Sequence, residues 1–260
     1  MTKKSAIILA AAVAALATGA AEARSYHKTY GYSTLDKGEM ELVYWSEYVA
    51  ASGNTMPYFG KNVDRKGLWS NTFEVEYGVT DRFNMAAYVD TESPSGEDTK
   101  VVQAHAVLGR YRLFEKGERF FDTTIYVEYY MPRIAWQGES KERLETRVIL
   151  QKDFGDMHLM LNPKFEKVIS GPNVTEGMEL EYAMGIYKTM SPVLTLGWEA
   201  YGNEIGSPVD LKDKKDQMHD MGPTAIYKIS KALTVNATLL FGLTEAADDT
   251  TVRAIFEYEI

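Results

Sequence analysis

The chain has 260 residues and a formal net charge of −9, and it contains no cysteine. The missing cysteines exclude a disulfide framework and thiolate metal sites. The acidic balance argues against a nucleic-acid partner, which favours basic patches. The 17 Tyr, 10 Phe and 4 Trp residues suit β-strands and also the aromatic girdles of membrane barrels. We expect no cofactor and no metal.

The first 23 residues have the pattern of a cleaved signal peptide. Lys3 and Lys4 give a positive start, the apolar run Ile7–Ala17 has the length of an h-region, and Ala21–Ala23 fits a small-x-small cleavage site. A membrane anchor is the alternative, but a spanning helix needs about 20 apolar residues. The pattern therefore predicts export, with cleavage near Ala23 and a mature chain of formal charge −10, since two lysines and one glutamate are removed.

The rest of the chain shows a repeated period-two alternation of apolar and polar side chains. In the first clear case Phe73, Val75 and Tyr77 alternate with Glu74 and Glu76. Successive strand residues point to opposite faces, so each such segment predicts a strand with one apolar face. The predicted strands are 38–51, 67–77, 82–90, 100–114, 119–131, 141–152, 157–169, 177–189, 193–201, 217–229, 233–244 and 251–260.

The fourth of these strands departs from strict alternation. Gln103 and His105 share a parity with Val107, Tyr111 and Leu113, so polar and apolar side chains would fall on one face. An extra residue in one strand shifts the parity of all later residues in that strand, and the pattern therefore predicts a β-bulge.

The predicted connections alternate between short and long. Short turns are expected at 78–81, 115–118, 153–156, 190–192 and 230–232, and longer loops at 52–66, 91–99, 132–140, 170–176, 202–216 and 245–250. Short turns on one rim and longer loops on the other are typical of outer-membrane barrels, with the turns and both termini in the periplasm. A soluble β-sandwich shares the periodicity. The export signal, the rim asymmetry and strands of about 10 residues favour a transmembrane up-and-down antiparallel β-barrel of about 12 strands, formed by residues 24–260.

The last predicted strand is rich in aromatic residues. Phe256 and Tyr258 share its apolar face with Ile260, at a position where Phe or Trp is usual. A strand of this kind resembles the signal that the outer-membrane insertion machinery reads. We therefore expect that machinery and outer-membrane lipid as partners.

The stretch from Met218 to the end resembles the C-terminal half of bacterial outer-membrane proteins assigned to phenol-degradation meta-pathways or to transport. The matching pieces are Gly222-Pro223, Gly242-Leu243-Thr244 and Asp248-Asp249, and Met190–Asn203 is similar too. The resemblance implies an outer-membrane barrel that exports or takes up small, often hydrophobic molecules.

If the apolar face meets lipid, the charged face lines the lumen. The candidate lumen-lining residues are Glu74, Glu76, Glu128, Arg143, Glu145, Arg147, His158, Lys164, Glu179, Glu181, Glu199, Arg253 and Glu257. Isolated charges in a narrow barrel would be costly, so we expect them to form pairs or to contact water. Aromatic residues near the strand ends are predicted to form the outward girdles: Tyr44, Trp45, Tyr48, Tyr58, Phe59, Trp69, Trp136, Trp198 and Tyr201.

Two functions are open at this point. One is a channel or porin-like protein for a small solute, hydrophobic and aromatic molecules included. The other is a non-conducting structural or docking barrel with a salt-bridged lumen. Twelve strands lie between side-chain-filled barrels of about 8 strands and open porins of about 16. We expect no enzyme, because the chain has no Gly-x-Ser-x-Gly nucleophile elbow.

Overall fold

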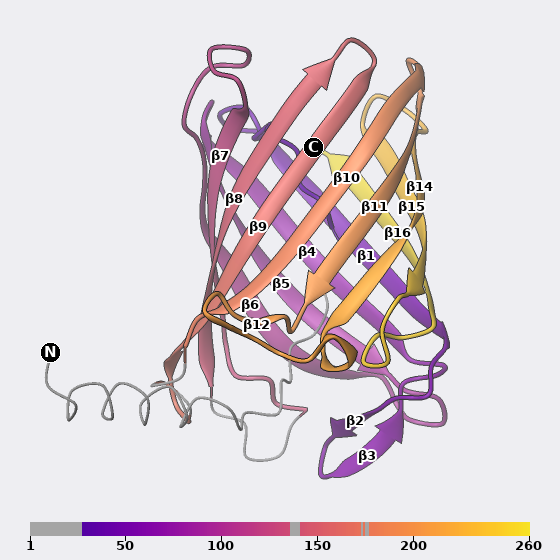
Figure 1. Ribbon diagram of the computed structural model, residues 1–260. Helices are drawn as coiled ribbons and strands as arrows, with labels where there is room; N and C mark the ends of the chain where they lie inside the picture. Colours follow the sequence, from indigo (N-terminus) through magenta and orange to yellow (C-terminus); the bar gives the residue numbers. More distant parts are fainter. Residues whose placement is uncertain (1–27, 136–140, 173, 175–176) are drawn as a thin grey trace, which may run out of the picture.

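The computed structural model describes residues 28–135, 141–172, 174 and 177–260. Twelve antiparallel strands form a closed barrel, in which each strand pairs with the barrel strands before and after it and β1 pairs with β16 (Figure 1). The barrel strands are β1 (Met40–Ala51), β4 (Trp69–Thr80), β5 (Phe83–Ser93), β6 (Lys100–Arg112), β7 (Asp122–Tyr130), β8 (Glu142–Phe154), β9 (Met157–Ser170), β10 (Glu179–Ser191), β11 (Leu194–Asn203), β14 (Met218–Lys228), β15 (Leu233–Gly242) and β16 (Thr250–Glu259). The prediction of an all-β, twelve-stranded antiparallel barrel is confirmed. The predicted signal peptide, 1–23, lies outside the described residues.

Among the described residues, four shorter strands and one helical turn lie in the long loops. They are β2 (Thr55–Tyr58), β3 (Lys61–Asp64), β12 (Gly206–Ser207), β13 (Asp210–Leu211) and the 3-10 helix η1 (Lys214–Asp216). The β2–β3 hairpin, which the alternation did not predict, stands at the rim opposite the C-terminus (Figure 1). In the part of the chain that the structure describes, no helix has both the length and the apolar character needed to cross a bilayer.

The two faces of the barrel wall differ as the alternation predicts. On β4, Phe73 is 55% exposed whereas Glu74 is 2% exposed. On β15, Ala237 is exposed on the outside and Thr238 is buried on the inside. The outer surface is thus a belt of apolar side chains, as in barrels that span a bilayer, and the polar residues point inward.

The predicted bulge in β6 is present. The pairing of β6 with β7 shifts register between Val107 and Gly109. The extra residue lets Gln103 and His105 face inward while Tyr111, further along the strand, lies 45% exposed on the outside. The bulge therefore reconciles the mixed parity of this strand.

The rims are less regular than predicted. The predicted tight turn over 115–118 is present, since the Glu118 N–H donates to the Glu115 carbonyl at 3.1 Å, but the whole β6–β7 connection is longer, because β7 begins only at Asp122. The Asp122 carboxylate accepts a hydrogen bond from the Gly117 backbone at 2.5 Å, which closes the connection without further strand pairing. The alternation of short and long connections is otherwise kept.

The girdle prediction is wrong for several aromatic residues. Tyr44, Trp69 and Trp198 are exposed on the outside, but Trp45, Tyr58 and Tyr201 are each 4% exposed or less. Trp45 and Tyr201 point inward because the parity of their strands places them beside the lumen carboxylates. Tyr58 packs inside the rim hairpin, β2–β3, with Met56 and neighbouring apolar residues. Trp136 lies outside the described residues.

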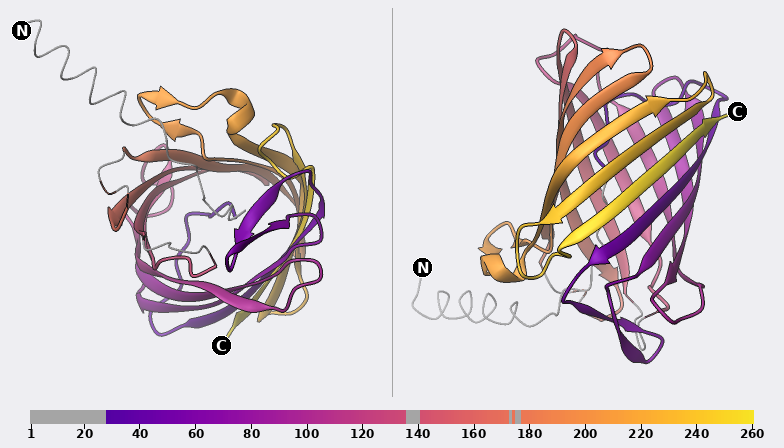
Figure 2. Two further views of the ribbon diagram at one scale, coloured as in Figure 1. Left: turned by 90° about the horizontal axis from the view of Figure 1, so that it is seen from below. Right: turned by 90° about the vertical axis from the view of Figure 1, so that its right-hand side faces the viewer.

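Residues 28–35 form no barrel strand and run inside the barrel; we call them the lumenal segment (Figure 2). The chain joins β1 at the short-turn rim, where the Gly38 N–H donates to the Gly78 carbonyl at 2.8 Å. A Cβ on Gly78 would lie 2.0 Å from the Asp36 carbonyl oxygen, so only glycine permits this close approach. Tyr30 packs into an apolar cluster inside the barrel with Trp45 and Tyr126, among others.

Candidate functional site

The candidate site is the interior of the barrel. Of the residues predicted to line it, ten are buried and three are half-buried, namely His158, Glu179 and Glu257. Their partners come from neighbouring strands and from the lumenal segment.

The first group, which we call the wall cluster, consists of Tyr187, Glu199, Tyr201, Thr238 and Arg253. Arg253 donates from Nη2 to Glu199 Oε2 at 2.7 Å and from Nη1 to the Tyr201 hydroxyl at 2.8 Å. The hydroxyls of Tyr187 and Tyr201 donate to the same carboxylate at 2.7 and 2.8 Å. Arg253 is fully buried, at 0% exposure, so each charge depends on the other for compensation.

A second group continues across β8, β9 and β10. Arg147 Nη2 lies 2.8 Å from Glu145 Oε1, and Lys164 Nζ lies 3.6 Å from the other oxygen of Glu145. Lys164 also pairs with Glu181 at 2.5 Å. The charges alternate in sign along this row, which offsets part of the cost of burying them.

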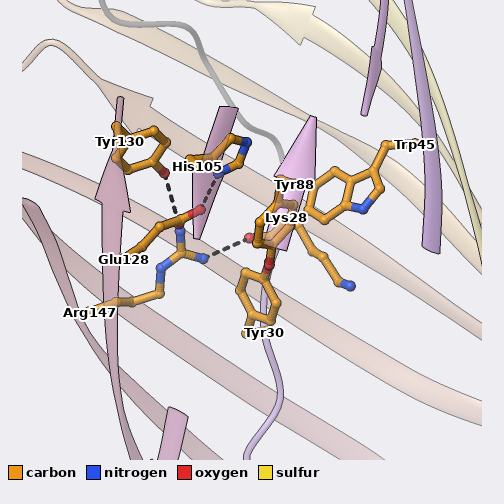
Figure 3. A pocket seen from close by; sticks show the side chains of 8 residues that line it. All are labelled: Lys28, Tyr30, Trp45, Tyr88, His105, Glu128, Tyr130 and Arg147. Carbon is orange, nitrogen blue, oxygen red and sulfur yellow. Dashed lines mark hydrogen bonds and ion pairs between the residues drawn. The ribbon is translucent and has the colours of Figure 1, made fainter. Parts of the chain in front are cut away.

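His105 on β6 stands at the centre of a third group (Figure 3). Its two ring nitrogens contact the carboxylates of Asp90, at 3.1 Å, and Glu128. The imidazole is stacked between the rings of Tyr88 and Tyr130, with centroid distances of 4.3 and 4.9 Å. The β6 bulge is what places His105 in this position.

Four of the other predicted residues form pairs closer to the strand ends, whereas Glu74 accepts a hydrogen bond from Trp45 and Glu257 pairs with Lys28. These pairs are Glu76–Arg110 at 3.5 Å, Arg143–Glu166 at 3.4 Å, His158–Asp153 at 2.8 Å and Glu179–Lys212 at 3.1 Å. The expectation that lumen charges would pair with one another holds for these residues.

The lumenal segment is held by side chains of the wall rather than by a strand ladder. The Asn162 side chain accepts from the Tyr30 backbone N–H at 2.7 Å and donates to the Tyr30 carbonyl at 3.0 Å. Gln151 accepts from the Tyr32 backbone at 2.9 Å, and Arg110 donates to the Gly31 carbonyl at 2.7 Å. Three strands of the wall, β6, β8 and β9, thus contact one short piece of chain.

Lys28 lies at the inner end of the segment. Its ammonium is 2.9 Å from Glu257 Oε1 on β16 and 4.9 Å from the ring centroids of both Tyr30 and Trp45. Figure 3 shows the Lys28 side chain running beside Trp45, on the side away from His105. The segment therefore connects opposite walls of the barrel.

The space left beside the segment is a cavity of about 230 Å³. Its lining includes Lys28, Glu41, Glu76, Arg110 and Glu257. A second space, between Tyr88 and Arg147, has only about 10 Å³, too little for more than a single water. The lumenal segment thus leaves a polar cavity beside it in the lumen.

Sequence patterns missed the lumenal segment. Residues 28–35 have no alternation that assigns them to a strand, and their partners are distant in sequence: Tyr30 and Asn162 are 132 residues apart. One indirect signal existed. The inner wall carries more carboxylates than cations on β1, β4 and β16, and a cation from elsewhere had to compensate them.

Comparison with known proteins finds solved structures of the same fold. An outer membrane channel from Pseudomonas putida F1 matches with a TM-score of 0.54 and 14% identity, over 88% of this chain and 98% of that one. The NanC porin matches with a TM-score of 0.56 and 8% identity, over 84% of this chain and 100% of that one. The KdgM porin in complex with disordered oligogalacturonate matches with a TM-score of 0.53 and 10% identity, over 84% of this chain and 98% of that one. No family model and no curated protein matches the chain. At these identities the likeness establishes the shared barrel fold.

Proposed function

We propose that this chain is a porin-like channel of the bacterial outer membrane that passes a small solute. The observation that carries the proposal is the opposition of the two barrel faces, one apolar and exposed, the other charged and hydrogen-bonded around a cavity of about 230 Å³. A barrel with such faces is stable only when lipid covers the outside. The porins and the channel that share the fold support the same conclusion.

Three further expectations belong to this proposal. Residues 1–23 act as a signal peptide, and mass spectrometry of the mature protein should give Arg24 as its first residue. The C-terminal strand β16, with Phe256 and Tyr258 exposed on its outer face, is the part that the insertion machinery engages. We expect no catalysis, because the chain carries no Gly-x-Ser-x-Gly nucleophile elbow.

The solute class follows from the cavity more than from the family resemblance. Proteins linked to phenol degradation would suggest a hydrophobic or aromatic solute. The cavity here is lined by charged residues from four strands and the lumenal segment, including Glu41, Arg110 and Glu257. Such a lining favours a small polar or charged solute, because an apolar one would leave these groups without water or partners.

The lumenal segment has to shift for a solute to pass. It crosses the lumen between β9 and β16 and is attached through side-chain hydrogen bonds, which individually contribute only about 0.5–1.5 kcal/mol. A segment held in this way can leave the wall without unfolding the barrel. We propose that its displacement separates a closed state from a conducting one.

The channel is tested by planar-bilayer recording of the refolded mature chain. We expect discrete conductance steps, with closures caused by the segment. The absence of steps at any voltage would favour the alternative, a non-conducting docking barrel, for which the paired charges of the lumen are the supporting observation.

The closed state is tested by tethering the segment. The chain has no cysteine, so the pair Gly31→Cys and Met160→Cys provides the only thiols; a Cβ on Gly31 would lie 3.3 Å from Met160 Cε. Bridging the two with a short cleavable bis-thiosulfonate should suppress conductance, and reduction should restore it. Each single-cysteine variant, treated alike, is the control. Equal conductance before and after bridging would contradict the role of the segment.

A further inference from the structure

The surroundings of the Lys28 ammonium have the composition of a cation-binding site. The inward column of β1 begins with Glu41, Val43 and Trp45, and Val43 is paired with Glu74 on β4 and with Glu257 on β16. One aromatic ring and three carboxylates therefore surround one point on the inner wall. We call Glu41, Trp45, Glu74 and Glu257 the β1 site.

The carboxylates of the β1 site depend on a cation that the wall does not supply. Glu74 is 2% exposed; its Oε2 accepts from Trp45 Nε1 at 2.9 Å, but its buried Oε1 has no hydrogen-bond partner of standard geometry among the described residues. Arg110, a wall cation that lines the same cavity, is engaged by Glu76 and by the Gly31 carbonyl. Lys28 is thus the cation that compensates this site.

Lys28 reaches the β1 site from a piece of chain that is not part of the wall. Its side chain is 13% exposed and that of Glu257 is 25% exposed, and both line the cavity of about 230 Å³. When the lumenal segment withdraws, Tyr30 and Lys28 leave together, whereas Trp45 and the carboxylates stay in place on their strands. The site is then open to the cavity and lacks its cation.

We propose that the β1 site binds the ammonium group of a small organic cation, and that Lys28 is a competitor built into the chain. This inference rests on the proposed channel function and names the class of its solute. In the closed state the Lys28 ammonium occupies the place of the solute; in the conducting state the solute replaces it. The exchange keeps one positive charge beside the carboxylates in both states.

The chemistry of the β1 site selects this class over others. A ring face and carboxylates together attract an alkylammonium group, which can contact both. An anion would be repelled by three carboxylates. A small inorganic cation would gain the charge interaction but would keep its water and make no apolar contact with the indole of Trp45.

The test is calorimetric titration of n-butylammonium chloride into the folded protein in a non-ionic detergent. In Lys28→Met the site has no internal competitor, so butylammonium should bind at least about tenfold more tightly than in the unaltered chain. Adding Glu257→Gln to Lys28→Met should weaken that binding by about tenfold. Sodium butyrate should give no binding in any variant.

Chemical restoration of the ammonium is the matched control. Lys28→Cys carries the only thiol of the chain, since the natural sequence has none. Aminoethyl methanethiosulfonate adds an ammonium at that position and should return butylammonium binding to the level of the unaltered chain. Methyl methanethiosulfonate adds no charge and should leave the tight binding unchanged. Heat-modifiable migration shows that each variant is folded.

The outcomes separate this inference from the channel function. Butylammonium binding that is no tighter in folded Lys28→Met, or that sodium chloride at equal concentration abolishes, would overturn the β1 site even if the barrel conducts. Binding as expected in a barrel that never conducts would support the β1 site and reject the channel.

Discussion

Two of the charge clusters in the lumen differ in how their members are attached. In the wall cluster, Glu199 and Arg253 both lie on barrel strands and are almost fully buried. In the β1 site, Glu257 lies on a strand, but its partner Lys28 lies on a segment without strand pairing. The first pair can separate only if the barrel opens, whereas the second can separate while the barrel stays closed. The comparison indicates that the wall cluster stabilises the barrel, whereas the β1 site allows Lys28 to be exchanged for a solute.

The largest expected effect comes from breaking the wall cluster. Arg253→Met leaves the Glu199 carboxylate buried without its cation, and we expect a loss of about 3–5 kcal/mol in the free energy of unfolding. Urea unfolding in lipid vesicles, followed by tryptophan fluorescence, measures it. Lys28→Met is the matched control and should lose less, because Glu257 is 25% exposed and can turn toward the cavity, so fewer charges stay buried without a partner. Equal losses in the two variants would remove the distinction between the clusters.

A smaller effect is expected from a charged residue on the outer surface of the barrel. The proposed roles of both clusters require that lipid covers this surface. Ala237→Arg should cost about 2–4 kcal/mol near mid-membrane, because an exposed outward position on β15 has no polar partner. Thr234→Arg, on the inner face of the same strand and paired with Glu257, should cost much less. The same vesicle unfolding assay compares them. If Ala237→Arg lowers the free energy of unfolding no more than Thr234→Arg does, water and not lipid covers this face.

The third prediction concerns the attachment of the lumenal segment, which carries Lys28, to the barrel wall. Asn162→Leu removes both hydrogen bonds to the Tyr30 backbone, each worth about 0.5–1.5 kcal/mol, so the lumenal segment should detach more often. The rate at which an aqueous thiol reagent labels Gly31→Cys should rise by about tenfold. Asn236→Leu removes an amide that lines the same cavity but hydrogen-bonds to wall residues such as Thr224, and should leave the rate unchanged. If Gly31→Cys is labelled at the same rate with and without Asn162→Leu, other contacts hold the lumenal segment.

The smallest effect concerns the loop that follows the rim hairpin, which lies outside the lumen. Arg65 binds the Asp248 carboxylate with hydrogen bonds of 2.9 and 2.6 Å, joining this loop to the β15–β16 loop. Asp248→Asn should speed proteolysis of the loop and should lower the free energy of unfolding by less than Arg253→Met does, because the Arg65 side chain is 23% exposed and can turn to water. Lys61→Met removes an exposed ion pair with Glu97 and should change neither the rate of proteolysis nor the free energy of unfolding. A marked loss of global stability in Asp248→Asn would make the hairpin part of the barrel core.

The sequence pattern predicted the strands of the barrel wall but not the lumenal segment inside the barrel. Alternation is a local property, so it located all twelve strands and gave the correct face for Glu74 and Thr238. It even predicted the bulge that turns His105 inward. The lumenal segment depends instead on contacts between distant parts of the chain, such as Tyr30 with Asn162, and no local period encodes them.

The errors have a similar cause. Trp45 and Tyr201 were predicted in the girdle from their residue type, although the parity of their strands already placed them inside. Side-chain type is a weaker guide than parity, because an indole or a phenol can donate a hydrogen bond to a lumen carboxylate as readily as to a lipid headgroup. Trp45 donates to Glu74 and Tyr201 donates to Glu199 in just this way.

The shortness of the chain between Lys28 and the first barrel residue, Met40, has a quantitative consequence. A group tied to its site by so few residues returns to it as if it were present in free solution at millimolar concentration. A solute that competes for the β1 site must approach that concentration before it holds the site for much of the time. The barrel would therefore respond to abundance: it stays closed when the solute is scarce and opens steadily as the supply outside the cell rises past the threshold that its own tether sets.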